Sequence, residues 1–442
     1  MRFLESQFAL TANGTTVRTE ALAGLTTFLT MAYIIFVQPA VLSACGMDFG
    51  AVLVATCLST AFATVLMALL ANYPIAVAPA MGHNFFFVYS VVVGMKVPWR
   101  VALGGVAVAG LIFVLTAGIG LRERLITAIP RSIKHAIAAG IGLLIATIGL
   151  EWAGLIVGAP GTLVTLGDLH SVPVLLAIAV LTLTAVLMAR GAPGALLYGI
   201  LAGTAIGLPL GIVRYQGLAS APPSIAPTLL QLDIAGAFAP GMIAVVFMFF
   251  LLALFDSVGT LVGVGEQAKL MRDGTLPRAR QALLADAIGT IVGAALGTST
   301  LTAYIESGAG VAAGGRTGLA SIVTAALFVL SLFLYPLVRM IGGGYALGAM
   351  TLYPVIAPAL ILVGTMMIGG LRHVAWEDPT EAIPAFLTVI MMPLAVSITE
   401  GVAFGLIAYA VLKLSSGRGR DVHPLIYVFA VLFLARYAFL GA

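Results

Sequence analysis

Charged side chains are scarce in this chain, and their scarcity decides the class of protein. Only 9% of the 442 residues are Asp, Glu, Lys or Arg, where a soluble domain has about 25%. Apolar residues make up 61% and the mean hydropathy is +1.14, which is more apolar surface than so few charges can cover in water. The composition therefore excludes a soluble enzyme, a nucleic-acid-binding protein and a disordered chain.

The sequence also lacks the residues from which most covalent and metal chemistry is built. Its two cysteines, Cys45 and Cys57, lie in apolar runs without metal-ligand spacing, so neither a disulfide framework nor a zinc site is indicated. No P-loop, CxxC or HExxH motif occurs, and nothing arranges His and Ser residues as a hydrolytic triad. We therefore expect neither an enzyme nor an ATP-driven pump, and no cofactor or metal. The mixed polar N-terminus predicts no cleavable signal peptide.

Long apolar runs fill most of the chain. Stretches of about 20 apolar residues can cross a bilayer as helices, and the runs with their breakers predict fourteen spans. We expect a further amphipathic segment over 424–440, on the membrane surface or against the bundle. The predicted spans are 21–44, 51–72, 83–95, 100–121, 133–150, 172–189, 193–213, 238–265, 283–296, 303–314, 317–340, 345–370, 380–396 and 399–415.

The basic residues are distributed as this number of spans requires. With the N-terminus in the cytoplasm, alternating loops leave Lys96, Arg100, Arg214 and Arg339 outside, and the other 17 of the 21 Lys and Arg residues inside. Cytoplasmic loops of membrane proteins carry such an excess. We therefore expect a multi-pass protein of the plasma (bacterial inner) membrane with both termini cytoplasmic.

The polar loop 214–235 divides the predicted spans into two sets of seven. Because seven is odd, a repeat of this length must be inverted in the membrane. The third span of each set is interrupted: prolines and a glycine break the segment 72–87, and the segment 297–310 is polar and rich in glycine. Interrupted helices at equivalent places in two inverted halves indicate a transporter's binding site.

Two acidic residues stand out well inside predicted spans, where a charge costs roughly 2.5–3.5 kcal/mol on insertion scales. Asp256 follows a long apolar run, and Glu306 lies in the broken span of the second half. Such residues are usually functional; the alternative is a structural acid hydrogen-bonded to a helix end. Other acids fall near predicted span ends and are expected at the membrane interface: Glu151, Asp286, Glu377, Asp378 and Glu400.

Polar and aromatic residues near the broken spans leave several interpretations open. The Asn84 amide could bind a ligand or cap the first broken helix. His83 could carry a proton, or it could be an interior histidine whose ring nitrogens are hydrogen-bonded. Phe85 could stack on a flat ligand or pack in the core. On the first span, the polar stripe that contains Thr27 could line a pathway.

Five stretches of the chain resemble the AzgA-like purine permeases, a branch of the nucleobase:cation symporters in the nucleobase-ascorbate transporter superfamily. The resemblance covers about residues 18–415. It rests on RTEALAGLTTFLTMAYI (18–34), ANYPIAVAPAMGHN (71–84), ALFDSVGTLVGVG (253–265), GTSTLTAYIESGAGVAAGGRTGL (297–319) and PAFLTVIMMPLAVSITEG (384–401).

This resemblance implies an all-α, uracil-transporter-like fold of fourteen transmembrane segments in a 7+7 inverted repeat, with short strands before the two broken spans. It implies proton symport of hypoxanthine, guanine or adenine by movement of a core domain against a gate domain, and a homodimer formed through the gate domains. The implied units are a cytoplasmic N-terminus (1–20), the core (21–121 and 236–340), the gate (122–213 and 341–416), a central loop (214–235) and a cytoplasmic C-terminal amphipathic helix (417–442).

By motif position, the resemblance implies that Asn84, Asp256 and Glu306 are the key polar residues. No cofactor is implied, and the coupling ion is expected to be a proton, carried by Asp256, Glu306 or His83. The residues that we expect to bind substrate are Glu306, Asn84, Asp256, Phe85, Thr27, Ser299, Thr300 and Gly82.

The motif around Asn84 departs from the family's usual Gly-Met-Gly-Leu-Asn-Ala. Ala80, His83 and Phe85 replace the first Gly, the Leu and the Ala, and Gln38 replaces an Asn that the family commonly has. A preference for xanthine, uracil or another planar or anionic solute therefore stays open. The embedded acids disfavour an anion carrier, and the two broken spans disfavour a receptor that binds without transporting.

Overall fold

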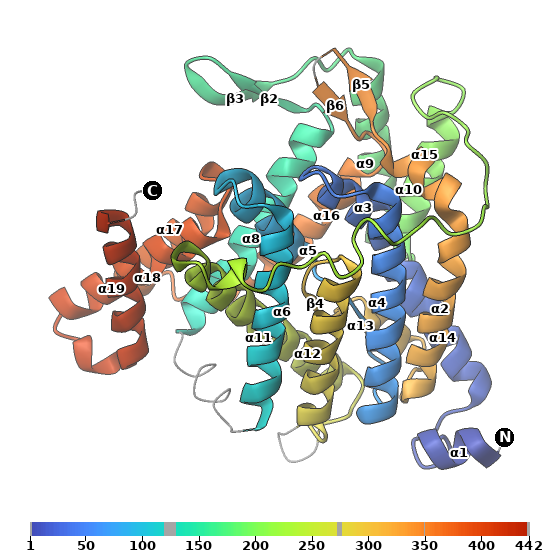
Figure 1. The fold of residues 1–442 in the computed structure, drawn as a ribbon, viewed down its shortest axis with the longest axis horizontal. Coiled ribbons are helices and arrows are strands. Elements are labelled where there is room, and N and C mark those ends of the chain that lie inside the picture. Colours follow the sequence, from blue (N-terminus) through green and yellow to red (C-terminus); the bar gives the residue numbers. More distant parts are fainter. Residues whose placement is uncertain (1, 119–129, 272–275, 349, 440–442) are drawn as a thin grey trace.

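A computed structural model describes residues 2–118, 130–271, 276–348 and 350–439, most of them in helices (Figure 1). Within these residues, nine helical segments are long and apolar enough to cross a membrane. Each of the fourteen predicted spans overlaps a helix or half-helix of the structure. The predicted end of the fourth span, residues 119–121, lies outside the described part.

The first half of the chain supplies ten described helices and three short strands. They are α1 (Arg2–Phe8), α2 (Val17–Met31), α3 (Tyr33–Ser43), α4 (Phe49–Leu70), β1 (Val77–Pro79), α5 (Met81–Phe85), η1 (Phe86–Gly94), α6 (Trp99–Gly118), α8 (Arg131–Trp152), β2 (Ile156–Ala159), β3 (Thr162–Leu166), α9 (Val172–Ala189) and α10 (Ala195–Gly207).

The second half is built from a similar series. It comprises η2 (Gly236–Phe238), α11 (Pro240–Gln267), α12 (Ala279–Leu296), β4 (Leu301–Ala303), α13 (Ser307–Ala312), α14 (Gly318–Leu330), η3 (Ser331–Leu334), α15 (Tyr335–Gly342), β5 (Tyr345–Leu347), β6 (Met350–Leu352), α16 (Ala357–Ile368), η4 (Gly369–His373), α17 (Pro379–Leu394), α18 (Ile398–Ser415), η5 (Gly419–Asp421) and α19 (Pro424–Phe439).

The two broken spans meet at their strands. β1 and β4 pair antiparallel, with Ala78 opposite Thr302, and each strand leads into a short helix, α5 or α13. The pairing continues beyond the strands, because the Ala80 N–H donates to the Thr300 carbonyl at 3.0 Å. Each broken segment thus satisfies the backbone groups of the other, which a membrane-embedded chain requires.

The two halves repeat one detail at this crossing. The Thr64 hydroxyl of α4 donates to the carbonyl of Val77 and accepts from its N–H, at 3.1 and 3.0 Å. The Thr290 hydroxyl of α12 makes the same pair of bonds with Leu301, at 3.0 and 3.1 Å. In each half, a threonine on the helix of the second predicted span therefore anchors the first residue of the strand that precedes the broken helix.

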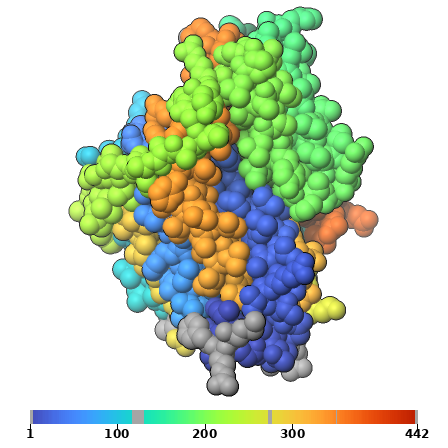
Figure 2. Space-filling model, turned by 90° about the vertical axis from the view of Figure 1, so that its right-hand side faces the viewer, coloured from blue at the N-terminus to red at the C-terminus, as the bar shows by residue number. Residues whose placement is uncertain are grey.

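The helices pack in two groups. In one, α4 packs against α12 and α14, and α6 against α11 and α12; in the other, α8 packs against α16 and α17, and α17 against α18. The segment 214–235 between the halves runs along the first group (Figures 1 and 2). Backbone N–H groups of Ser220, Leu230 and Asp233 tie it to the carbonyls of Phe333, Ala295 and Arg100.

Two hairpins differ from the sequence prediction. The span predicted over 345–370 begins as the hairpin β5–β6, and its helix α16 starts only at Ala357. The hairpin β2–β3 was not predicted. The apolar residues of β5 and β6 extend the hydrophobic run, but Gly344 and Gly348 adopt positive φ values of 76° and 60°, which favour turns over a continuous helix.

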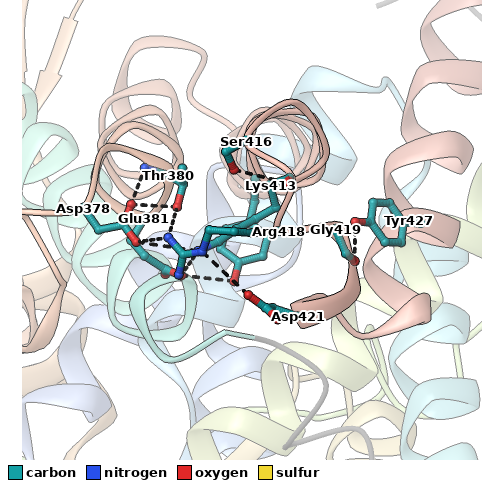
Figure 3. Close-up of polar contacts among 10 residues, drawn as sticks. Asp378, Thr380, Glu381, Lys413, Ser416, Arg418, Gly419, Asp421 and Tyr427 are labelled. Carbon is teal, nitrogen blue, oxygen red and sulfur yellow. Dashed lines mark hydrogen bonds and ion pairs between the residues drawn. The ribbon is translucent and has the colours of Figure 1, made fainter.

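A charged cluster fastens α17 to α18 (Figure 3). The Lys413 side chain is only 2% exposed, and its Nζ lies 2.8 Å from Glu381 Oε1. The Arg418 Nη1 donates to Asp378 Oδ2 at 2.7 Å. This bond, with those from Thr380, holds the pKa of Asp378 below its usual range. Its stabilising effect is therefore present at neutral pH and is lost only as the pH falls through that lowered pKa.

Glu20 is a buried acid that fastens α2 to the start of α14. Its carboxylate is fully buried and accepts from the backbone N–H groups of Arg316 at 2.8 Å and of Thr317 and Ala320 at 3.2 Å. These donors surround the first turn of α14, so Glu20 fills the role of a helix cap from another helix.

Replacing Glu20 with Ala is expected to destabilise the protein by on the order of 3 kcal/mol, because it leaves buried backbone donors without an acceptor. Thermal unfolding of the purified variant in detergent measures the effect. Glu5→Ala is the matched control, since Glu5 is exposed near the N-terminus. Equal unfolding temperatures for the Glu20 and Glu5 variants would contradict the assigned role.

Candidate functional site

A cavity of about 110 Å³ lies where the crossed strands meet α3, α11 and α16. Its lining brings together the two membrane-embedded acids that the sequence singles out, Asp256 and Glu306, with the predicted Gly82. Tyrosine, methionine, threonine and aliphatic side chains form the rest of its walls. The lining residues are Tyr33, Ala80, Met81, Gly82, Asp256, Thr260, Thr302, Ala303, Tyr304, Ile305, Glu306, Val363, Met366 and Met367.

The two acids are held by hydroxyl groups from neighbouring elements. The Tyr33 hydroxyl of α3 donates to Glu306 Oε1 at 2.8 Å. The Thr302 hydroxyl of β4 donates to Asp256 Oδ2 at 3.0 Å. Each carboxylate therefore has a fixed orientation and keeps further acceptor capacity toward the cavity, since an ionised carboxylate offers about four lone-pair sites.

His83 lies directly behind Asp256. Its Nδ1 is 3.9 Å from Asp256 Oδ2, too far for a hydrogen bond. The side chain is 4% exposed, and among the described residues neither ring nitrogen has a hydrogen-bond partner. A small approach of the two side chains would bring His83 within hydrogen-bond distance of Asp256.

Asn84 is not among the described lining residues, and its side chain lies in a buried amide cluster. Its side-chain amide pairs with that of Gln38 on α3, and its Oδ1 also accepts from the Ser299 hydroxyl. Gln38 donates in turn to the Thr298 hydroxyl at 3.0 Å. The cluster ties both broken segments to α3. Gln38, which departs from the family pattern, is therefore a direct hydrogen-bond partner of Asn84.

Three other predicted site residues are absent from the lining of the cavity. The Phe85 ring is buried and stacks on Tyr89, with centroids 5.7 Å apart. Thr27 is buried where α2 packs against Gly310 of α13. Thr300 is buried beside the strand crossing. Asn84 and Ser299, like these three residues, are outside the described lining of this cavity, so their expected contact with substrate stays a prediction.

Comparisons with known proteins identify the family of this chain. A protein-family model described as the Permease family (Xan_ur_permease) matches residues 18–404. The chain belongs to this family. It is therefore a transporter and not an enzyme, and a multi-pass integral membrane protein.

Named relatives extend over almost the whole chain. The adenine permease AdeP of Escherichia coli is 46% identical over 99% of this chain and 97% of its own length. The guanine/hypoxanthine permease PbuG of Bacillus subtilis is 43% identical over 97% of this chain and 98% of its own. A putative permease of Methanocaldococcus jannaschii is 49% identical over 100% of this chain and 99% of its own length. The resemblance to AzgA-like purine permeases is thus confirmed.

The fold is shared with more distant membrane carriers. The transmembrane domain of the cyanobacterial bicarbonate transporter BicA matches with a TM-score of 0.64 and 16% sequence identity, covering 88% of this chain and 97% of that one. At this identity the likeness shows the fold alone. This permease is thus a mostly helical membrane protein that shares the fold of that transporter domain.

The structure adds two residues to the cavity lining and shows one buried acid behind it. Tyr33 and Tyr304 line the cavity, and the Tyr304 hydroxyl donates to the Pro79 carbonyl at 2.6 Å. Asp286 was expected at the membrane interface, but it is fully buried and accepts from the Ala303 N–H at 3.2 Å. That prediction was wrong because α12 places Asp286 behind β4, a contact that no local sequence signal reveals.

Gly82 allows the first broken helix to approach α8. A Cβ at this position would lie 2.7 Å from Ile141 Cγ2. Gly82→Ala is therefore expected to displace α5 and to weaken ligand binding about tenfold, since overpacking typically costs about 1–3 kcal/mol. Adding Ile141→Ala should restore binding. A double variant that binds no better than Gly82→Ala would contradict this explanation; isothermal titration calorimetry in detergent measures all three.

Proposed function

We propose that this permease imports the purine nucleobases hypoxanthine, guanine or adenine by proton symport. The observation that carries the proposal is the presence of two carboxylates, Glu306 and Asp256, in one cavity between the crossed broken segments and α16. The names of the relatives, which include adenine and guanine/hypoxanthine permeases, support the substrate class.

The cavity chemistry suits a neutral purine. A purine edge carries N–H groups, and the Glu306 carboxylate can accept hydrogen bonds from them. The Tyr33 hydroxyl donates to the same carboxylate and holds it in place. A purine also has two aromatic faces, and the rings of Tyr33 and Tyr304 line the cavity. From the opposite side, Met366 and Met367 of α16 offer polarisable thioethers that adapt to a flat ligand.

The coupling proton is assigned to the group formed by Asp256, Glu306 and His83. Asp256 is the principal candidate, because its side chain is 44% exposed and lies between the cavity and the buried imidazole. A carboxylate that alternates between charged and neutral forms changes what the cavity binds and how readily its helix moves through the membrane.

Transport requires the cavity to open alternately to the two sides. The packing supports a core made of residues 21–121 and 236–340 and a gate made of 122–213 and 341–416, since α4, α6, α11, α12 and α14 pack together, as do α8, α16, α17 and α18. The cavity lies between the groups, and among its described lining residues those from the gate all belong to α16. Sliding of the core past α16 would carry the substrate across, within fourteen spans arranged as an inverted 7+7 repeat.

The orientation and assembly follow the same proposal. The excess of basic residues on one side supports cytoplasmic termini in the plasma (bacterial inner) membrane. The gate is the proposed surface of a homodimer, with membrane lipid around the core. α19 packs along α18 and is proposed to be a cytoplasmic-side amphipathic helix.

A different planar or anionic solute is the alternative substrate. An anion would meet two carboxylates in this cavity, which disfavours it unless both are protonated. Xanthine and uracil are compatible with the same contacts. Competition for binding therefore tests the proposal: unlabelled adenine, guanine, hypoxanthine, xanthine and uracil are compared for displacement of radiolabelled hypoxanthine from the purified protein. Displacement by purines ahead of uracil is expected; absence of hypoxanthine binding would reject the proposal.

A further inference from the structure

A second, larger cavity opens at the end of the bundle that carries the hairpin β5–β6. Its volume is about 570 Å³, against about 110 Å³ for the inner cavity. It is formed by the ends of α3 and α15, the start of α4, the chain after α10, and β5. In the proposed orientation this end of the bundle faces outward, because Arg214 and Arg339 are two of only four basic residues assigned to that side.

The charge of this outer cavity is positive and uncompensated within the described residues. Arg214 and Arg339 both line it, both are exposed, and neither forms an ion pair with a described residue. No Asp or Glu is among its described lining residues. The neighbouring carboxylate of Asp48 accepts from the Ala51 N–H at 2.8 Å as the cap of α4. Two guanidinium groups in one concave site favour a phosphate or another oxyanion.

The same cavity also presents flat aromatic surfaces. Tyr345 and Tyr353 line it, and the Tyr353 ring is held against Trp152, with centroids 4.3 Å apart. Gly344 permits this arrangement: its φ is 76°, and a Cβ there would lie 2.9 Å from Tyr353 Cε1. A ligand that combines a planar ring with an oxyanion would match both parts of the lining.

We propose that the outer cavity binds a purine nucleoside monophosphate, a ligand with both features that is larger than the inner cavity accommodates. The proposal rests on the proposed function for its role: a nucleotide held here would compete with nucleobase entry without being transported. The two cavities are close enough for this, because Tyr33 of the inner cavity and Ala40 of the outer one are separated by about 10 Å along α3.

Direct binding of GMP to the full chain in nanodiscs tests the proposal, with guanosine and inorganic phosphate as the partial ligands. GMP is expected to bind about tenfold more tightly than either partial ligand. The double variant Arg214→Gln, Arg339→Gln is expected to weaken GMP binding about tenfold or more. Arg100→Gln is the matched control: Arg100 is assigned to the same side but lies over the Trp99 ring and not in the cavity lining.

Hypoxanthine binding reports the folding of each variant and separates the two proposals. The paired arginine variant should bind hypoxanthine as the unmodified protein does, because neither arginine lines the inner cavity. GMP binding that survives the paired substitution, or phosphate binding equal to GMP binding, would overturn the outer site. GMP binding without any hypoxanthine binding would instead overturn the proposed function and leave the outer site standing.

Discussion

Glu306→Gln is expected to weaken purine binding by about ten- to a hundredfold, the range for losing a hydrogen bond to a charged group in a buried site. The variant keeps the shape of the side chain and leaves an oxygen for the Tyr33 hydroxyl, which now donates to Glu306 Oε1 at 2.8 Å. The other end becomes an NH₂ group, which would point a donor at the N–H donors of the purine edge. The measurement is equilibrium binding of radiolabelled hypoxanthine.

Glu266→Gln is the matched control for this experiment. Glu266 is an exposed acid near the end of α11, outside the cavity lining, so its substitution removes the same charge without touching the site. An affinity for hypoxanthine that is unchanged in the Glu306 variant would remove Glu306 from the substrate site.

Asp256→Asn is expected to abolish purine accumulation against a gradient while leaving substrate exchange largely intact. The amide oxygen can still accept from the Thr302 hydroxyl, which donates to Asp256 at 3.0 Å, so the local structure is kept. The amide cannot take up or release a proton near neutral pH, so the proton gradient can no longer drive the transport cycle. The measurement compares gradient-driven uptake with counterflow exchange in proteoliposomes.

His83→Leu is the companion variant, because it installs the residue that the family commonly has at this position. If Asp256 alone carries the proton, this variant should still accumulate purine. Accumulation at a normal rate by the Asp256→Asn protein would show that Asp256 is not the required coupling residue, and the assignment would then pass to Glu306.

The sequence revealed the acids of the site because their signal is local. A carboxylate in an apolar run, such as Asp256, or in a glycine-rich break, such as Glu306, is expensive wherever the chain folds. Gly82 was identified in the same way, from the proline and glycine interruptions that mark the first broken span. All three line the cavity.

The supporting residues could not be predicted because their roles depend on contacts far apart in the chain. Gln38 and Asn84 pair across 46 residues, and Tyr33 reaches Glu306 across 273. A tyrosine in an apolar span is ordinary, so nothing in its surroundings marks Tyr33 as a ligand-facing residue. The burial of Asp286 was missed for a similar reason, since it depends on the packing of α12 against neighbouring elements that include β4.

The fold was predicted most accurately where long apolar runs are interrupted by clear breakers. The helix α9 has the bounds that the sequence predicts, 172–189. The hairpin β5–β6 was missed because its apolar residues continue a hydrophobic run, and only its glycines indicate a turn.

Uptake of radiolabelled hypoxanthine into proteoliposomes, with and without an inward proton gradient, tests the central claim most directly. The account predicts uptake that the gradient stimulates, that a protonophore abolishes, and that unlabelled purines inhibit more strongly than uracil. Hypoxanthine uptake equal in the presence and absence of the gradient would contradict proton coupling, and the absence of any uptake by protein that is folded would contradict purine transport itself.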